Sequence, residues 1–128
     1  MEMQWEEFEP GPALPSAEQI YVTINPKGHL YLKSRTIKAL GEPDAVILMY
    51  DRRKQAIGIK RAPLDRHNAY RLRKKDGPRT GGRMIYTANF CRHHHIKPDK
   101  TLAFTAAEID KNGVLILSMH QVSAARKK

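Results

Sequence analysis

Hydrophobic and polar residues alternate along much of the chain after residue 20, and this alternation predicts β-strands. Ile20, Val22 and Ile24 alternate with Tyr21 and Thr23, as expected for a strand that buries one face. Turn residues separate further segments of this kind. These predicted strands cover residues 29–32, 45–50, 56–60, 70–74, 83–87, 101–109 and 114–119.

Two short helices are predicted between these strands. The first covers Arg35–Leu40, with Ser34 as its N-cap and Gly41 in the position that follows a helix. The second covers Ala88–His95. The order ββαββ therefore occurs twice along the chain.

The two halves have matching landmarks. Gly28 and Gly82 lie 54 positions apart and Pro43 and Pro98 lie 55 apart, which indicates two copies that differ by about one residue. One such unit leaves strand edges unpaired, and a second copy can cover them. We therefore expect a mainly β fold with short helices, a pseudo-twofold β-barrel made of two ββαββ units. Its expected parts are an acidic, Pro-rich, flexible arm (1–19), a first unit (20–61), a connector (62–69), a second unit (70–119) and a basic tail (120–128).

Charge is distributed unevenly along the chain. The formal net charge is +10, yet residues 1–19 contain five Glu and no Lys or Arg, so the remainder is more basic still. A strongly basic body attracts polyanions, most commonly nucleic acid, by releasing their counterions. The alternative is a soluble protein with a merely basic surface.

Composition also indicates the cellular compartment in which the protein is expected. Cys91 is the single cysteine, so no internal disulfide can form, which fits a reducing cytoplasm. The acidic N-terminal stretch does not resemble a secretory signal. No apolar run approaches the roughly 20 residues of a membrane span. A cytoplasmic protein without a membrane partner is expected.

In residues 20–61, Gly28-His29-Leu30-Tyr31-Leu32 enters a helix that ends Lys38-Ala39-Leu40-Gly41, and two strands joined by a turn at Asp51 follow. This pattern resembles the AbrB/SpoVT family of bacterial DNA-binding domains. The second half begins the same pattern with Gly82-Arg83, while Ile96 stands where Leu-Gly would end its helix. The resemblance implies a swapped-hairpin barrel, closed within one chain as in the duplicated MraZ-like relatives, and DNA binding. Such a barrel could be a monomer or a homodimer.

The family places basic residues in the strand before the first glycine, whereas this chain has Val22, Thr23 and Ile24 there. The basic residues lie instead in the second half, on two predicted strands and a glycine-rich turn. Double-stranded DNA is the expected partner and the chain is expected to be a transcriptional regulator or chromosome-associated protein. The candidate DNA-binding residues are Arg71, Arg73, Lys74, Lys75, Arg79 and Arg83, with Lys27, Lys33, Arg35 and Lys38 from the first half. A solubilising charged hairpin is the alternative explanation for the second-half cluster.

Other chemistry has less support in the sequence. Three adjacent imidazoles, His93–His95, cannot converge on one ion from a regular helix, because neighbouring residues point about 100° apart. Cys91 stands beside Arg92 and His94 but at an apolar helix position, and no catalytic fingerprint is present. We expect no enzyme activity, cofactor or metal. A second hypothesis is an antitoxin-type protein-interaction module that uses the acidic, aromatic residues 1–19 to bind a protein partner.

Overall fold

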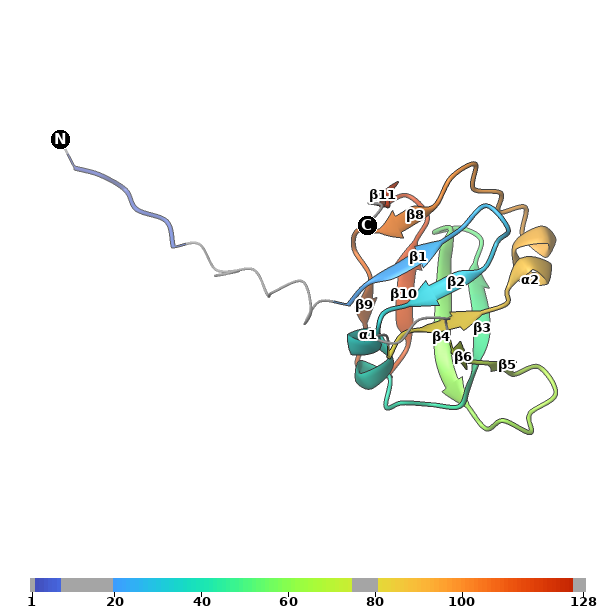
Figure 1. The fold of residues 1–128 in the computed structure, drawn as a ribbon. Coiled ribbons are helices and arrows are strands. Elements are labelled where there is room, and N and C mark those ends of the chain that lie inside the picture. Colours follow the sequence, from blue (N-terminus) through green and yellow to red (C-terminus); the bar gives the residue numbers. More distant parts are fainter. Residues whose placement is uncertain (1, 8–19, 75–80, 126–128) are drawn as a thin grey trace.

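The computed structural model describes residues 2–7, 20–74 and 81–125. Within these residues the protein is mainly β, with two antiparallel sheets and two short helices (Figure 1). None of the helices in this part is long and apolar enough to cross a membrane. The predicted mainly β fold with short helices is confirmed.

The first sheet has six strands in the order β11-β8-β1-β2-β7-β6. The β1–β2 hairpin lies at its centre, between two strands from the second half of the chain (Figure 1). The strands of this sheet are β1 (Val22–Ile24), β2 (Leu30–Leu32), β6 (Arg73–Lys74), β7 (Arg83–Ile85), β8 (Leu102–Phe104) and β11 (Val122–Ala124).

The second sheet has five strands in the order β5-β3-β4-β10-β9. The long β3–β4 hairpin carries the largest share of its pairing, and β10 of the second half pairs with β4. Both sheets thus combine strands from the two halves. The strands of this sheet are β3 (Ala45–Asp51), β4 (Ala56–Ala62), β5 (Tyr70–Arg71), β9 (Glu108–Ile109) and β10 (Leu115–Ser118).

The inward side chains of both sheets form one hydrophobic core. Successive side chains of a strand point to opposite faces, so every second residue can be buried. Burial of each aliphatic side chain stabilises the fold by about 1.5–3 kcal/mol. The fully buried aliphatic residues include Val22, Ile24, Leu30 and Leu32 from the first sheet and Ile57, Ile59, Leu115 and Leu117 from the second.

The helices α1 (Ser34–Ala39) and α2 (Ala88–His93) begin and end close to the predicted positions. Ser34 is not the N-cap: Lys33 holds that position, and no side chain caps the helix. Gly41 follows α1 with a φ of +88°, as predicted. After α2 the left-handed residue is His95, with a φ of +59°, and not Ile96, which follows it. The N–H of Ile96 donates to the carbonyl oxygen of Cys91 and closes the helix.

Two predicted strands are divided in the structure. Residues 70–74 split at Leu72, where the chain leaves the five-stranded sheet for the six-stranded sheet, and residues 101–109 split at a turn after Phe104. Alternation of side chains continues through such a change of sheet, so the sequence pattern does not reveal it. Residues 120–128 were expected to form only a tail, but Val122–Ala124 pair with β8 as an edge strand.

Candidate nucleic-acid interface

Four of the predicted basic residues lie on three successive strands at the edges of the two sheets. Arg71 ends β5, Arg73 and Lys74 form β6, and Arg83 begins β7. β6 pairs with β7, which also pairs with β2, and we call these two outermost strands of the six-stranded sheet the β6–β7 ribbon (Arg73–Lys74 with Arg83–Ile85). Lys75 and Arg79 lie outside the described residues.

The local fold directs these side chains outward. Leu72 is half-buried and packs against the core, while Arg71 and Arg73 on either side of it are exposed. The N–H of Leu72 donates to the carbonyl oxygen of Asp44, at an N···O distance of 3.1 Å. Because alternate residues face opposite sides of an extended chain, anchoring Leu72 inward holds both guanidinium groups in solvent.

Lys74 stands directly opposite Arg83 in the ribbon. Like charges in this arrangement repel and lower the stability of the pair of strands. Nη1 of Arg83 donates to the carbonyl oxygens of Gly81 and Gly82, both at 3.0 Å, so this guanidinium is fixed by the backbone. Among the described residues no carboxylate forms an ion pair with any of the four cations of this region. Within the described residues its positive charge is therefore not neutralised by a carboxylate.

A stack of three planar groups lies beside the ribbon. The guanidinium carbon of Arg73 lies 4.8 Å from the ring centroid of Tyr86, and the His29 ring centroid lies 5.0 Å from the same ring. Tyr86 is 54% exposed despite its size. The backbone N–H of Thr87 donates to Nδ1 of His29 at 3.1 Å, which fixes the imidazole. This Arg73–Tyr86–His29 stack joins the ribbon to the turn between β1 and β2.

The candidate residues of the first half fall into two places. Lys27 is exposed on the β1–β2 turn, next to His29. Arg35 and Lys38 are exposed on α1, and Lys33 precedes that helix with its ammonium group 5.8 Å from the Tyr21 ring centroid. The turn and α1 lie at opposite ends of the β1–β2 hairpin (Figure 1). The structure therefore does not gather all predicted cations at one point.

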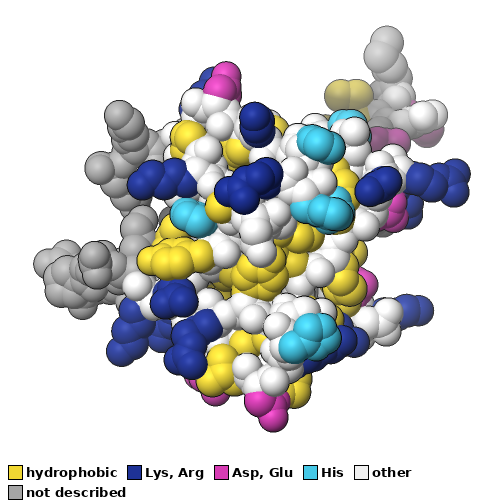
Figure 2. Space-filling model, turned by 90° about the vertical axis from the view of Figure 1, so that its right-hand side faces the viewer, with side chains coloured by type: hydrophobic (Ala, Val, Ile, Leu, Met, Phe, Trp, Pro, Cys, Tyr) yellow, Lys and Arg dark blue, Asp and Glu magenta, His cyan; other side chains and the backbone are white. Residues whose placement is uncertain are grey.

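Figure 2 shows the face of the molecule on the α2 side. Lys, Arg and His side chains surround hydrophobic side chains at the centre of this face, and the acidic side chains lie towards its margin. Sequence reasoning named Arg73 but missed its contact with Tyr86 and the contact of Tyr86 with His29. Tyr86 follows a strand and precedes a helix, and nothing in its local pattern indicates a contact with a residue 57 positions earlier.

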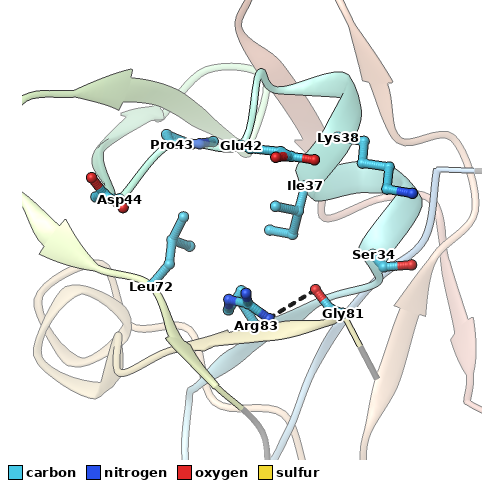
Figure 3. Close-up of a pocket in the computed structure, with 9 residues that line it drawn as sticks. All are labelled: Ser34, Ile37, Lys38, Glu42, Pro43, Asp44, Leu72, Gly81 and Arg83. Atoms are coloured by element: carbon cyan, nitrogen blue, oxygen red, sulfur yellow. Dashed lines mark hydrogen bonds between the residues drawn. The ribbon is translucent and has the colours of Figure 1, made fainter. Parts of the chain in front are cut away.

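A pocket of about 370 Å³ lies between α1 and the β6–β7 ribbon. Lys38 and Arg83 supply its positive charge, and Glu42 and Asp44 its negative charge (Figure 3). In Figure 3 the Arg83 guanidinium lies below Ile37, with its hydrogen bond to Gly81 drawn. Because both positive and negative side chains line the pocket, its charge does not favour an anion over a cation.

The histidines of α2 pack as aromatic groups. The His94 ring centroid lies 4.4 Å from the ring centroid of Tyr50 and 4.7 Å from that of Phe90. Its Nδ1 is buried and has no hydrogen-bond partner in the described part of the chain. Burial, helped by the charges of His93, Arg52 and His95, lowers the pKa of His94. No group of three or more His, Cys, Asp or Glu residues suited to a metal ion occurs in the same part.

Cys91 is buried beneath the β1–β2 turn. Its Sγ lies 3.3 Å from the carbonyl oxygen of Gly28, which also accepts a hydrogen bond from the hydroxyl of Thr87. Burial raises the pKa of the Cys91 thiol. A raised pKa disfavours the thiolate, which is the reactive form of cysteine. Cys91 thus holds the two halves of the chain together and lacks the environment of a nucleophile.

No family model, curated protein or solved structure matches this chain.

Proposed function

We propose that this protein binds double-stranded DNA through the β6–β7 ribbon and its neighbour Arg71. The observation that carries the proposal is the set of four cations, Arg71, Arg73, Lys74 and Arg83, on the strands β5, β6 and β7, without an ion-pair partner in the described residues. Lys74 and Arg83 face each other across the ribbon, an arrangement that a bound phosphate would stabilise. A regulator of transcription or a chromosome-associated protein is the role that fits this activity.

The buried state of β1 supports the choice of this edge. Val22, Thr23 and Ile24 occupy the positions where the AbrB/SpoVT family has basic residues, and all three are buried. A DNA contact at β1 would require unfolding of the core. We therefore assign DNA binding to the second half of the chain, where the strands that precede the equivalent glycine contain Arg71, Arg73 and Lys74.

The same proposal includes a barrel of two ββαββ units. Three observations support it: each sheet mixes strands from both halves, the chain passes between the sheets at Leu72, and the left-handed residues Gly41 and His95 end the two helices 54 positions apart. That separation equals the one between Gly28 and Gly82. In such a barrel the β6–β7 ribbon and the β1–β2 hairpin occupy equivalent positions of the two units.

The test is fluorescence anisotropy with a labelled duplex of mixed sequence, measured from low to near-physiological salt. We expect a steep decrease of affinity with salt, because released counterions drive the association. The triple variant R71Q/R73Q/K74Q should reduce the slope of log K against log salt by about 2.7, if each charge neutralises one phosphate.

The matched control is K97Q/K100Q/K111Q, which removes the same charge. Lys97 and Lys100 precede β8, and Lys111 follows β9, at the opposite edges of the sheets from β6 and β5. The control should retain most of the affinity. Equal losses in the two variants would indicate attraction by net charge alone, and no binding at low salt would refute DNA binding.

A second candidate function is the binding of a protein partner through the N-terminal arm. Trp5 is 86% exposed and Met3 68% exposed, among the acidic residues Glu2, Glu6 and Glu7. Large exposed apolar side chains of this kind are common anchors in protein interfaces. Pull-down of a partner by the wild type and its loss with W5A/M3A would favour this function, whereas W5A/M3A should leave duplex affinity unchanged.

A further inference from the structure

We propose that the Arg73–Tyr86–His29 stack reads guanine in the major groove of the bound duplex. This inference rests on the proposed DNA binding and adds base recognition to it. Phosphate contacts position a protein on DNA, whereas contacts with base edges give specificity. The stack differs from the neighbouring cations because its groups are held in place by aromatic contacts.

Arg73 is oriented before any ligand binds. Its guanidinium carbon lies 4.8 Å from the centroid of the Tyr86 ring, so the ring supports one face of the charged group. None of its N–H groups has a hydrogen-bond partner among the described residues. A guanidinium that is already ordered loses less entropy on binding than a free arginine side chain. Arg73 therefore presents an unused, oriented set of donors to solvent.

His29 adds a second donor to the same surface. Its Nδ1 accepts a hydrogen bond from the backbone N–H of Thr87, so the neutral ring carries its proton on Nε2. Arg73 and His29 thus both offer donors beside the ring of Tyr86. Guanine presents two acceptors, O6 and N7, in the major groove, whereas adenine places an amino donor beside its N7. A surface of donors discriminates in favour of guanine.

The secondary structure is compatible with this groove. β6 and β7 are the two outermost strands at one edge of the six-stranded sheet, and a pair of strands is a β element that the major groove of B-form DNA admits. Arg71 lies two residues before Arg73 and is exposed, whereas Lys74 lies opposite Arg83 on the other face of the strand. With Arg73 on a base edge, Arg71 can reach a phosphate. Arg73 is then the specificity residue, Tyr86 is a positioning residue, and Arg71 contributes affinity.

The experiment compares three versions of one alternating G·C duplex by fluorescence anisotropy. In one version 7-deazaguanine replaces guanine, which removes the N7 acceptor, and in another inosine replaces guanine, which keeps N7 and O6 but removes the minor-groove amino group. We expect wild-type affinity to decrease about fivefold or more with 7-deazaguanine and to remain unchanged with inosine.

Two lysine variants separate the recognition of guanine from the general electrostatic attraction to DNA. R73K keeps the charge but loses the planar fork, so it should bind both guanine and 7-deazaguanine duplexes equally, with the salt slope of the wild type. R53K, in the exposed turn between β3 and β4, is the matched control and should keep the wild-type preference. Y86A should weaken the preference because it releases Arg73, while circular dichroism verifies that each variant is folded.

The outcomes distinguish the two proposals. Equal wild-type affinity for guanine and 7-deazaguanine duplexes, or a preference that survives in R73K, would overturn guanine reading and leave DNA binding intact. A preference lost with inosine would place the contact in the minor groove and also overturn it. Absence of binding to every duplex at low salt would refute DNA binding itself, and guanine reading with it.

Discussion

Replacing His95 by glycine should stabilise the protein. His95 follows α2 with a φ of +59°, in the left-handed region where a Cβ atom is crowded. Its side chain is exposed and makes no hydrogen bond in the described part of the chain. Gly41 occupies the corresponding place after α1 with a φ of +88°. His95→Gly therefore gives α2 the residue that α1 already has.

The expected gain follows from two opposing effects. The left-handed conformation costs a non-glycine residue about 1–2 kcal/mol. Glycine loses more backbone entropy on folding, which offsets about 0.5–1 kcal/mol of this. We expect a net increase of about 0.5–1 kcal/mol in the free energy of unfolding, which raises Tm by a few degrees in a domain of this size.

The assay is urea and thermal unfolding followed by far-UV circular dichroism. Fluorescence is unsuitable because Trp5, the single tryptophan, is almost fully exposed. Gly41→Ala is the matched reverse change and should destabilise by about 1–2 kcal/mol. Its Cβ would lie 2.6 Å from Nη1 of Arg61, the end of a flexible side chain that can move. Equal or lower stability of His95→Gly would refute the argument from backbone strain.

Three further predictions concern the contacts between the two halves and the α2 histidines. Thr87→Val removes a buried hydroxyl that donates to the Gly28 carbonyl oxygen, so urea unfolding should show a loss of about 1–3 kcal/mol; a loss below 0.5 kcal/mol would contradict this role. Because the folded state lowers the pKa of His94 below 6.5, the unfolded chain binds more protons as the pH falls through 6.5. Tm should accordingly decrease between pH 7 and 5.5, and His94→Leu should reduce that dependence; an identical pH profile in the variant would exclude His94 as its source. Finally, the raised pKa and burial of the Cys91 thiol predict a reaction with a disulfide reagent at pH 7 at least about tenfold slower in the native protein than in urea, and similar rates would contradict it.

Local patterns identified most elements because each depends on near neighbours in the chain. The alternation at Val22–Ile24 and the turn residues after it are properties of a few consecutive residues, and so is the left-handed Gly41. Lys33 rather than Ser34 precedes α1, a difference of one residue that hydrophobic periodicity does not resolve. The basic character of residues 71–74 and of Arg83 was likewise evident from the sequence.

Local patterns did not predict which strands pair with one another. The divisions at Leu72 and after Phe104 depend on which strand offers free N–H and C=O groups beside the chain. Strand β11 illustrates this most clearly, because Ser123 and Ala124 have little strand pattern of their own and form a strand by pairing with Ala103 and Leu102. Edge hydrogen bonds are available to any nearby extended backbone.

The sequence by itself determined most of the extended segments and where the positive charge is concentrated, since these follow from side-chain chemistry along the chain. Only the tertiary structure decided that Arg73 and His29, 44 positions apart, meet on the ring of Tyr86. It also decided that Lys74 faces Arg83, while Arg35 and Lys38 lie on α1, away from the β1–β2 turn. The physical reason is that alternation specifies the face of a strand, whereas the neighbour across that face depends on register and sheet order.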